Sequence, residues 1–284
     1  MTWYEDNLTT AEALIHRGEA TKIGRFACCP DSAAFPCTPA ITNDVFVLPQ
    51  QALQLQRNDD GYLFVEPGGV LFHRAGSELN RRPVSGLGDE AWWVAVHPDL
   101  FEAALSRYGL HCHDMGPSFV LPPILRLALL RLIRLARQEA VSAAVLDAEL
   151  LALFQAICAV KAGVPVPDAG HRAETLHRRQ GLVDKARRQL HATQDETFEL
   201  ARLATAVGAS PFHLTRVFRE VLGMTPGEYV KRLKVGAVTD ALLTRDSARL
   251  ADLAVELGFS SQSYMNRMVK QTLGQTPSQI RKFA

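Results

Sequence analysis

The chain has 284 residues, of which 47% are hydrophobic, and its formal net charge is +1. This length is enough for two domains that each bury their own core. The start of the chain lacks the basic and apolar regions of a signal peptide, and we expect no membrane span of ~18 apolar residues. Five cysteines are an odd number, which argues against a disulfide framework and favours a cytoplasmic protein with reduced thiols.

The charges are divided unevenly along the chain. Residues 1–170 hold 13 Lys and Arg against 19 Asp and Glu, a balance of −6. Residues 171–284 hold 18 against 11, a balance of +7. A basic C-terminal part fits a polyanionic partner, and an acidic remainder should stay off it.

The first half of the chain is predicted to be rich in strands. Residues 10–17 are predicted as a short helix capped by Thr10. Residues 53–56 then alternate apolar and polar residues, residues 58–61 form a turn, and residues 62–65 return as a hairpin. Many short strands at such spacing predict a small sandwich or barrel. The further strands are predicted at 45–48, 70–73 and 91–96.

Helices follow the strands. Pro98 to Tyr108 is predicted as one helix, and residues 124–137 and 146–160 as an antiparallel pair. The apolar surface of this pair is wider than one partner helix covers, so either a second subunit or the chain's own barrel should bury the excess. Gly163 to Gly170 reads as a linker, and a helix at about 182–192 begins the next domain. The predicted domains are residues 1–162 for effector binding and dimerisation (barrel to about 97, helical pair about 122–162), a linker at 163–174, and a DNA-binding domain at 175–284.

The C-terminal stretch from Leu200 to Phe283 contains an internal repeat. Leu203 to Gly208 recurs as Leu253 to Gly258, and Gly223-Met224-Thr225-Pro226 recurs as Gly274-Gln275-Thr276-Pro277. Such a repeat dictates the architecture. Each copy has the form helix, glycine-containing turn, helix, which is the layout of a helix-turn-helix.

Capping residues and apolar spacing predict where the repeat's helices lie. Ser210 and Ser261 can cap helices at 211–222 and 262–273, and Thr225 and Thr276 each open a capping box. The apolar residues of both helices follow the i, i+3, i+4, i+7 spacing of one buried face. The residues predicted on the opposite, exposed faces are Phe212, His213, Thr215, Arg216 and Arg219 in the first helix, and Gln262, Ser263, Asn266, Arg267 and Lys270 in the second.

These exposed residue types are the ones that read base edges. Arg suits guanine, Asn and Gln suit adenine, and Thr or an aromatic ring can contact the thymine methyl. A single helix of this composition is equally well a solvated face. Two matched helices joined by a long helix at 226–244 favour DNA, because they could enter successive major grooves ~34 Å apart.

The C-terminal part resembles the AraC/XylS family of bacterial transcription regulators over roughly residues 175–284. The resemblance rests on Gly258-Phe259-Ser260-Ser261, on Arg267, and on Gly274-x-Thr276-Pro277. It implies two DNA-binding helix-turn-helix units, with base reading by residues 212, 215 and 216 and by residues 262, 263, 266 and 267. One departure is Val269, where the family usually has Phe, and we expect a looser core in the second unit.

A barrel ahead of such a tail resembles the cupin-like effector-binding domain that many members of this family carry. We expect an α+β protein with a cupin-like barrel, flanking helices and an all-α DNA-binding domain. Barrel aromatics should line the interior, including Phe46 and Trp93, and arginines including Arg81 should hold an anionic group. The expected effector-binding residues are Phe64, Phe72, Arg74, Glu78, Arg82 and Trp92.

Two alternatives involve chemistry in the first domain. His111-x-His113-Asp114 is the only His pair at the spacing of a metal-dependent cupin enzyme, but it follows the last strand. Cys28, Cys29 and Cys37 could form a redox or alkylation sensor, although adjacent cysteines suit zinc poorly. Isolated His73 and His97 are expected as satisfied polar residues near the barrel surface.

The sequence therefore predicts a cytoplasmic transcription activator that is not an enzyme and holds no metal or cofactor. Its expected partners are promoter DNA, a small-molecule effector and a second copy of the chain, with RNA polymerase as a further candidate.

Overall fold

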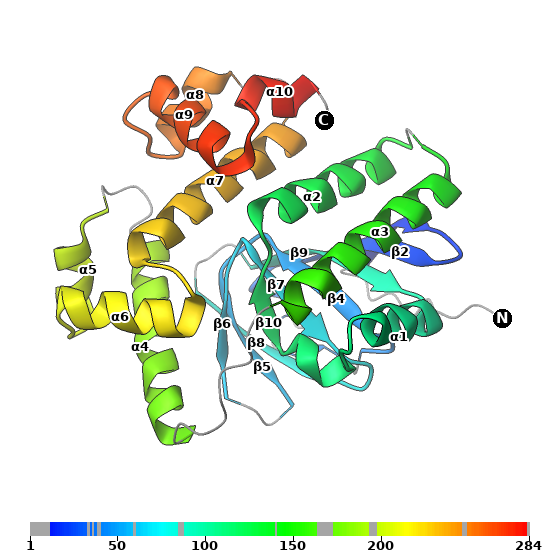
Figure 1. Ribbon diagram of the computed structural model, residues 1–284, viewed down its shortest axis with the longest axis horizontal. Helices are drawn as coiled ribbons and strands as arrows, with labels where there is room; N and C mark the ends of the chain where they lie inside the picture. Colours follow the sequence, from blue (N-terminus) through cyan, green and yellow to red (C-terminus); the bar gives the residue numbers. More distant parts are fainter. Residues whose placement is uncertain are drawn as a thin grey trace. The chain divides into compact units, whose positions relative to one another are not determined.

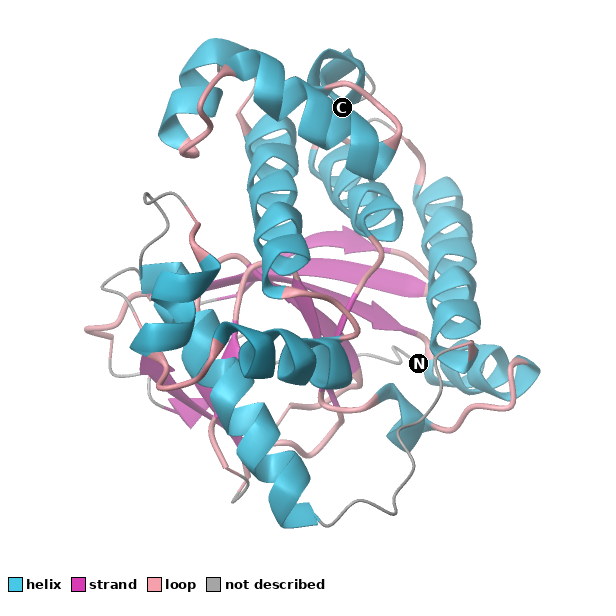
Figure 2. Ribbon diagram, turned by 60° about the vertical axis from the view of Figure 1, so that its left-hand side comes forward, coloured by secondary structure: helices cyan, strands magenta, loops and turns pink. Residues whose placement is uncertain are grey.

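The computed structural model describes residues 12–32, 35, 37–38, 41–58, 61–84, 88–139, 141–163, 173–192, 198–245 and 249–282. The chain divides into two compact units between Pro165 and Val166. The strands lie in the first unit, and the second unit is helical over its described residues (Figures 1 and 2). The α+β fold class is confirmed. Of the predicted linker at 163–174, residues 164–172 lie outside the described residues, and Ala173 and Glu174 belong to a helix.

The first unit contains two antiparallel sheets (Figure 1). The six-stranded sheet has the order β1-β2-β9-β4-β7-β10, and the four-stranded sheet has the order β3-β8-β5-β6. The predicted hairpin is confirmed as β5 paired with β6, with Leu53 opposite Val65. The strands are β1 (Glu12–Arg17), β2 (Thr21–Cys28), β3 (Cys37–Thr38), β4 (Val45–Pro49), β5 (Leu53–Arg57), β6 (Leu63–Val65), β7 (Gly69–His73), β8 (Leu79–Pro83), β9 (Asp89–Val96) and β10 (Ser118–Val120).

The helix predicted at residues 10–17 is wrong over the residues that the structure describes. Glu12–Arg17 is strand β1, which pairs antiparallel with β2 and has a β-bulge between Leu14 and His16. Pairing with the long, buried β2 overrides the local preference of a short segment, because β-structure depends on context more than on propensity.

The two sheets pack face to face but do not close into a barrel. Val47 and Leu71 of the six-stranded sheet share an apolar cluster with Leu53, Leu55 and Val65 of the four-stranded sheet. No strand pairing joins the two sheets among the described residues. The predicted barrel is therefore an open sandwich, whose core is the layer between the sheets.

The helices of the first unit cover the outer face of the six-stranded sheet (Figure 1). Phe46 and Phe72 project from this face, and the Phe46 ring lies 5.9 Å from Phe101 and 5.3 Å from Phe154. Phe46 and Phe72 were expected inside the barrel, and that placement is wrong. The helical segments predicted after the strands are confirmed as α1 (Pro98–Arg107) and the hairpin of α2 (Pro123–Arg137) and α3 (Ala143–Ala162). The 3-10 helix η1 (Cys112–Met115) was not predicted.

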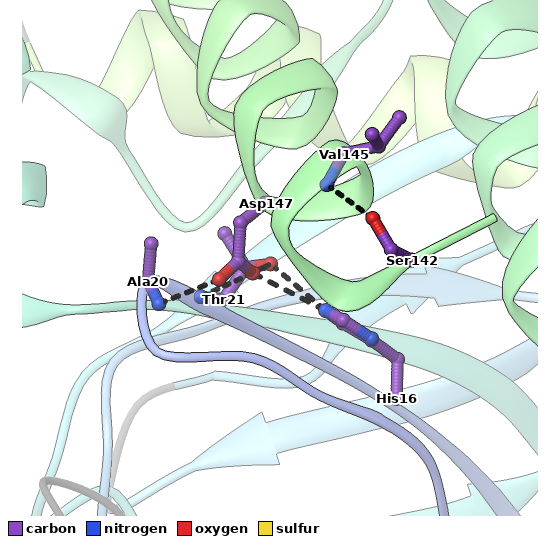
Figure 3. A network of polar contacts seen from close by, with 6 residues as sticks. All are labelled: His16, Ala20, Thr21, Ser142, Val145 and Asp147. Carbon is purple, nitrogen blue, oxygen red and sulfur yellow. Dashed lines mark hydrogen bonds and ion pairs between the residues drawn. The ribbon is translucent and has the colours of Figure 1, made fainter.

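One carboxylate ties helix α3 to the β1–β2 hairpin (Figure 3). The Oδ1 atom of Asp147 accepts hydrogen bonds from the Thr21 hydroxyl at 2.5 Å and the Thr21 amide at 3.0 Å. Its Oδ2 accepts from the Ala20 amide at 3.0 Å, and His16 Nε2 lies 3.2 Å from Oδ1. Burial raises the pKa of Asp147, but these hydrogen bonds together lower it by more than burial raises it. The pKa of Asp147 is therefore below its ordinary value.

Helix α3 corrects the expectation that nothing in the chain resembles a membrane span. By length and composition it could cross a membrane, with a mean hydropathy of 1.9 over 18 residues. Core helices of soluble proteins have the same composition, and 39% of this window is buried inside the protein. Leu150, Phe154 and Ile157 are among its buried residues, so the apolar character of α3 partly reflects packing within the first unit.

The second unit consists of helices in the described residues. α4 begins at Ala173, about nine residues before the predicted start. The long connecting helix at 226–244 and the helices predicted at 211–222 and 262–273, one after each turn, match their predicted bounds. The helices are α4 (Ala173–Ala192), α5 (Leu200–Ala206), α6 (Pro211–Leu222), α7 (Pro226–Thr244), α8 (Leu250–Glu256), α9 (Gln262–Leu273) and α10 (Pro277–Lys282).

Candidate nucleic-acid interface

Helix α6 is held in the first helix-turn-helix by its ends and by one buried face. The Ser210 hydroxyl accepts a hydrogen bond from the His213 amide at 3.2 Å, as the sequence predicted. The helix ends at Gly223, whose φ of 69° favours glycine. Leu214, Val217 and Phe218 are fully buried. The exposed residues of the helix lie outside this buried face.

The predicted reading residues of α6 lie on its free surface. Phe212 is 81% exposed, and His213, Arg216 and Arg219 are exposed as well, while Thr215 is half-buried. The Nη2 atom of Arg216 lies 3.4 Å from His213 Nδ1. Exposed contacts of this kind are worth little, so DNA could displace them at small cost.

Helix α9 repeats this arrangement in the second helix-turn-helix. The Ser261 hydroxyl accepts from the Tyr264 amide at 3.1 Å, and Gly274 ends the helix at a φ of 72°. Four apolar residues are buried, including Val269 at 0% exposure. The smaller residue at 269 therefore occupies a core position, as the sequence predicted. Of the predicted reading residues, Gln262, Ser263, Arg267 and Lys270 are exposed.

Asn266 and Tyr264 differ from the sequence-based expectation. Asn266 is only half-buried instead of exposed, and its Oδ1 atom is buried without a hydrogen-bond partner among the described residues. Tyr264 was left out of the predicted face, yet it is 37% exposed. The Arg267 guanidinium carbon lies 5.8 Å from the centre of the Tyr264 ring. The signal for Tyr264 is its position three residues before Arg267, which puts both on one helix face.

Helix α7 packs against both helix-turn-helix motifs. Its capping box is confirmed, since the Thr225 amide donates to Glu228 Oε2 at 2.7 Å and the Thr225 hydroxyl accepts from the Glu228 amide at 3.2 Å. These hydrogen bonds lower the pKa of Glu228. At its N-terminal end Tyr229 packs edge-on against Phe218 of α6, and further along α7 contacts α9 and α10. One rigid element thus supports both candidate reading helices.

The comparisons with known proteins agree with this arrangement. A helix-turn-helix domain model matches residues 203–282. The probable transcription factor PqrA of Proteus vulgaris is 33% identical over 89 residues, covering 31% of this chain and 72% of that protein. The chain belongs to the AraC/XylS family of transcription regulators.

Other relatives of the regulator match over a smaller share of their length. AdaA of Bacillus subtilis, named a bifunctional transcriptional activator and DNA repair enzyme, is 30% identical over 31% of this chain and 42% of its own. The activator RhaR of Klebsiella pneumoniae is 29% identical over 37% of each chain. The regulator therefore spans less than half the length of these two relatives.

Solved structures of similar proteins have low scores. An AraC-type transcriptional regulator from Chromobacterium violaceum has a TM-score of 0.35 at 24% identity, covering 37% of this chain and 94% of that one. ToxT of Vibrio cholerae has a TM-score of 0.41 at 10% identity, covering 94% and 99%.

The residues expected to bind an effector in the regulator's first unit do not converge on one place. Trp92 lies on the helix-covered face with Phe72, near Arg137 of α2. Phe64 alternates with Leu63 and Val65, which face the space between the sheets, so Phe64 faces away from it. Arg74, Glu78 and Arg82 are exposed. Their convergence inside a barrel is wrong, and their role in effector binding stays a prediction.

A cluster of polar residues lies between the sheets, and two of its members, Arg57 and Asp89, were not singled out from the sequence, whereas Arg81 was expected to hold an anionic group. The Arg57 guanidinium lies 3.1 Å from His73 Nδ1, and Arg81 Nε lies 2.6 Å from Asp89 Oδ2. Burial, Arg57 and Arg81 lower the pKa of His73 to about 3, and burial raises the pKa of Asp89. His73 is therefore neutral and buried, and its expected place near the barrel surface is wrong. Arg57 lies two residues after Leu55 on the face of β5 that Leu53 and Leu55 bury. This spacing was the signal in the sequence that Arg57 faces the other sheet.

The residues of the metal and cysteine alternatives can be placed in part. His111 and His113 flank the start of η1 and not a strand, with their ring centres 5.5 Å apart. Within the described ranges, no group of three or more His, Cys, Asp and Glu residues is arranged to hold a metal. Cys28 is buried and Cys29 is exposed. The side chain of Cys37 lies outside the description.

Proposed function

We propose that this regulator reads promoter DNA with the exposed faces of α6 and α9, placed in successive major grooves. The observation that supports the proposal is that two capped helices, mounted on the single helix α7, bury matching faces and leave Arg216 and Arg267 on their free surfaces. Arginine on a helix in the major groove can bind guanine in a bidentate manner.

The test of DNA reading is in vitro selection from a random DNA library with the full-length protein. The expected result is a motif with two conserved subsites about one helical turn apart, ~10 base pairs. Selection of a single short subsite, or of no motif above non-specific binding, would contradict reading by both helices.

We propose further that a small molecule with an acidic group controls the regulator from the space between the two sheets. Support comes from Arg57, His73, Arg81 and Asp89, because polar groups inside an apolar layer are costly and are retained where they serve structure or binding. A ligand can shift the regulator only if it binds the DNA-competent state with different affinity.

The effector proposal is tested by thermal shift with a panel of carboxylates, phosphates and matched neutral analogues. An acidic effector at 100 times its Kd should stabilise the protein by about 2.7 kcal/mol, and Arg57→Gln should abolish the shift. Stabilisation by neutral analogues alone would contradict an acidic effector.

A homodimer formed through helix α3 is the third part of the proposal. Val145 is 49% and Val160 39% exposed, and both lie on an exposed surface that includes Ala148, Ala152 and Ala159. Light scattering of the full chain should give twice the mass of 31.2 kDa. Ala152→Glu should shift the mass toward the monomer, because it places a charge in the middle of this surface. A monomer at all concentrations would contradict the dimer.

The other partners and the cellular site follow from the same function. A regulator that acts on promoter DNA is expected in the cytoplasm, with RNA polymerase as a further candidate partner. A metal-dependent enzyme fused to a DNA-binding tail is the alternative. Elemental analysis of the purified protein separates the two, because that alternative requires near-stoichiometric metal.

A further inference from the structure

The turn between α8 and α9 is attached to helix α7 by a lysine. The Lys234 ammonium donates a hydrogen bond to the carbonyl oxygen of Gly258 at 2.7 Å and lies 5.2 Å from the centre of the Phe259 ring. Lys234 is half-buried, and burial lowers its pKa. A hydrogen bond from a charged group is stronger than one between neutral groups, and the aromatic face adds to it.

The turn that Lys234 holds is itself well defined. Gly258 has a φ of 64°, and the amides of Gly258 and Phe259 bond back to the end of α8 at 3.1 and 2.8 Å. Phe259 is buried, and Ser261, two residues later, caps α9. A contact to this turn therefore acts on the start of α9, the end of a helix that usually reaches the base edges.

Helix α7 connects this turn to the first helix-turn-helix. Tyr229, five residues before Lys234, is buried against Phe218 of α6. Lys234 thus follows directly on the part of α7 that packs with the first helix-turn-helix, and its side chain reaches the turn of the second helix-turn-helix. The contact of Tyr229 with α6 and the hydrogen bond of Lys234 to Gly258 together limit how far α9 can move or rotate relative to α6.

We propose that Lys234 is a positioning residue that fixes the spacing between the two DNA subsites the regulator accepts. The proposal rests on the proposed function, namely that α6 and α9 each read one subsite. Lys234 need not touch DNA in this role, because it acts through the Gly258 carbonyl.

The test repeats the DNA selection with variants of the full chain and reads the distribution of spacings between the two subsites. Lys234→Met keeps most of the side chain but removes the donor, and it should broaden the distribution. In binding assays its preference for the best spacing over one that is one base pair longer should fall ~3- to 10-fold. Lys234→Arg keeps a donor and should retain the wild-type distribution. Lys231→Met, on the exposed side of the same helix, is the matched control.

The possible results separate this proposal from others. A Lys234→Met protein that loses affinity equally at all spacings would show a phosphate contact and overturn the positioning role. An unchanged spacing distribution would overturn it as well. If Lys234→Met lacks wild-type helix content by circular dichroism, Lys234→Leu, which also has no donor, takes its place with the same expectation. A wild-type motif without two subsites would instead count against the proposed function.

Discussion

The half-buried guanidinium of Arg57 lies 3.1 Å from Nδ1 of His73, which is buried between the two sheets. Because an arginine stays charged, His73 must accept this hydrogen bond as a neutral imidazole. Burial and the charges of Arg57 and Arg81 lower the pKa of His73 from 6.5 to about 3. The pair therefore links the stability of the first unit to pH.

We predict that this link destabilises the protein as pH falls. Between pH 6.5 and about 3 the unfolded chain takes up a proton at His73 that the folded chain does not. The free energy of unfolding should fall by ~1.4 kcal/mol for each unit that the pH falls within this window. Above pH 6.5 His73 is neutral in both states and should cause no such loss of stability.

His73→Gln should remove this part of the pH dependence. The measurement is urea unfolding at pH 7 and pH 5.5 by tryptophan fluorescence, because Trp92 and Trp93 lie in strand β9 of the first unit. His213→Gln, at an exposed site of the second unit, is the control. Equal pH dependence in wild type and His73→Gln would contradict the prediction.

Gly18 should not tolerate a side chain. A Cβ atom there would overlap the Asp147 carboxylate, which is fixed by Thr21 and Ala20. Gly18→Ala should lower the free energy of unfolding by ~1–3 kcal/mol, the usual cost of overpacking. Thermal melts followed by tryptophan fluorescence measure it. Gly61→Ala, which has open space around it, should melt like the wild type.

Asp147→Asn should destabilise the first unit at neutral pH and remove a loss of stability in acid. The folded pKa of Asp147 is lowered, so its contribution is complete above the ordinary Asp pKa of about 4 and is lost as pH falls through the folded value. Unfolding at pH 7 and pH 3 would test both effects. A variant as stable as the wild type at pH 7 would show that the network of Figure 3 contributes little.

The DNA-reading face is tested by Arg216→Ala and Arg267→Ala. Each should weaken binding to the selected site by ~1–3 kcal/mol and relax the choice of base at one position. Mobility shifts on the selected site and its single-base variants measure both quantities. Arg232→Ala, exposed on α7, should leave base preference unchanged. Unchanged affinity in both test variants would refute groove reading by these helices.

The helical half of the fold could be predicted because its signals are local. Ser210, Gly223, Thr225 and Ser261 each specify a helix end by their own hydrogen bonds or backbone angle, and the structure confirms them. The reading faces follow from the same periodicity. Asn266 was misplaced because it lies at the edge of the apolar face, where spacing alone does not separate buried from exposed.

The first unit was predicted less well because both faces of its larger sheet are buried. In β9 the residues from Ala91 to Val96 are all buried, so alternation cannot tell which of them face the other sheet. Phe72 and Trp92 were therefore assigned to the wrong face. His73 and Arg57 are 16 residues apart in sequence and meet only through strand packing.

The sequence by itself determined the doubled helix-turn-helix and most of the residues exposed on its reading helices, because caps, turns and helical periodicity act within a few residues. Only the tertiary structure decided that β1 is a strand, that the sandwich stays open, and that His73 lies neutral beside Arg57. These features depend on contacts between distant segments, whose partners a local pattern does not specify.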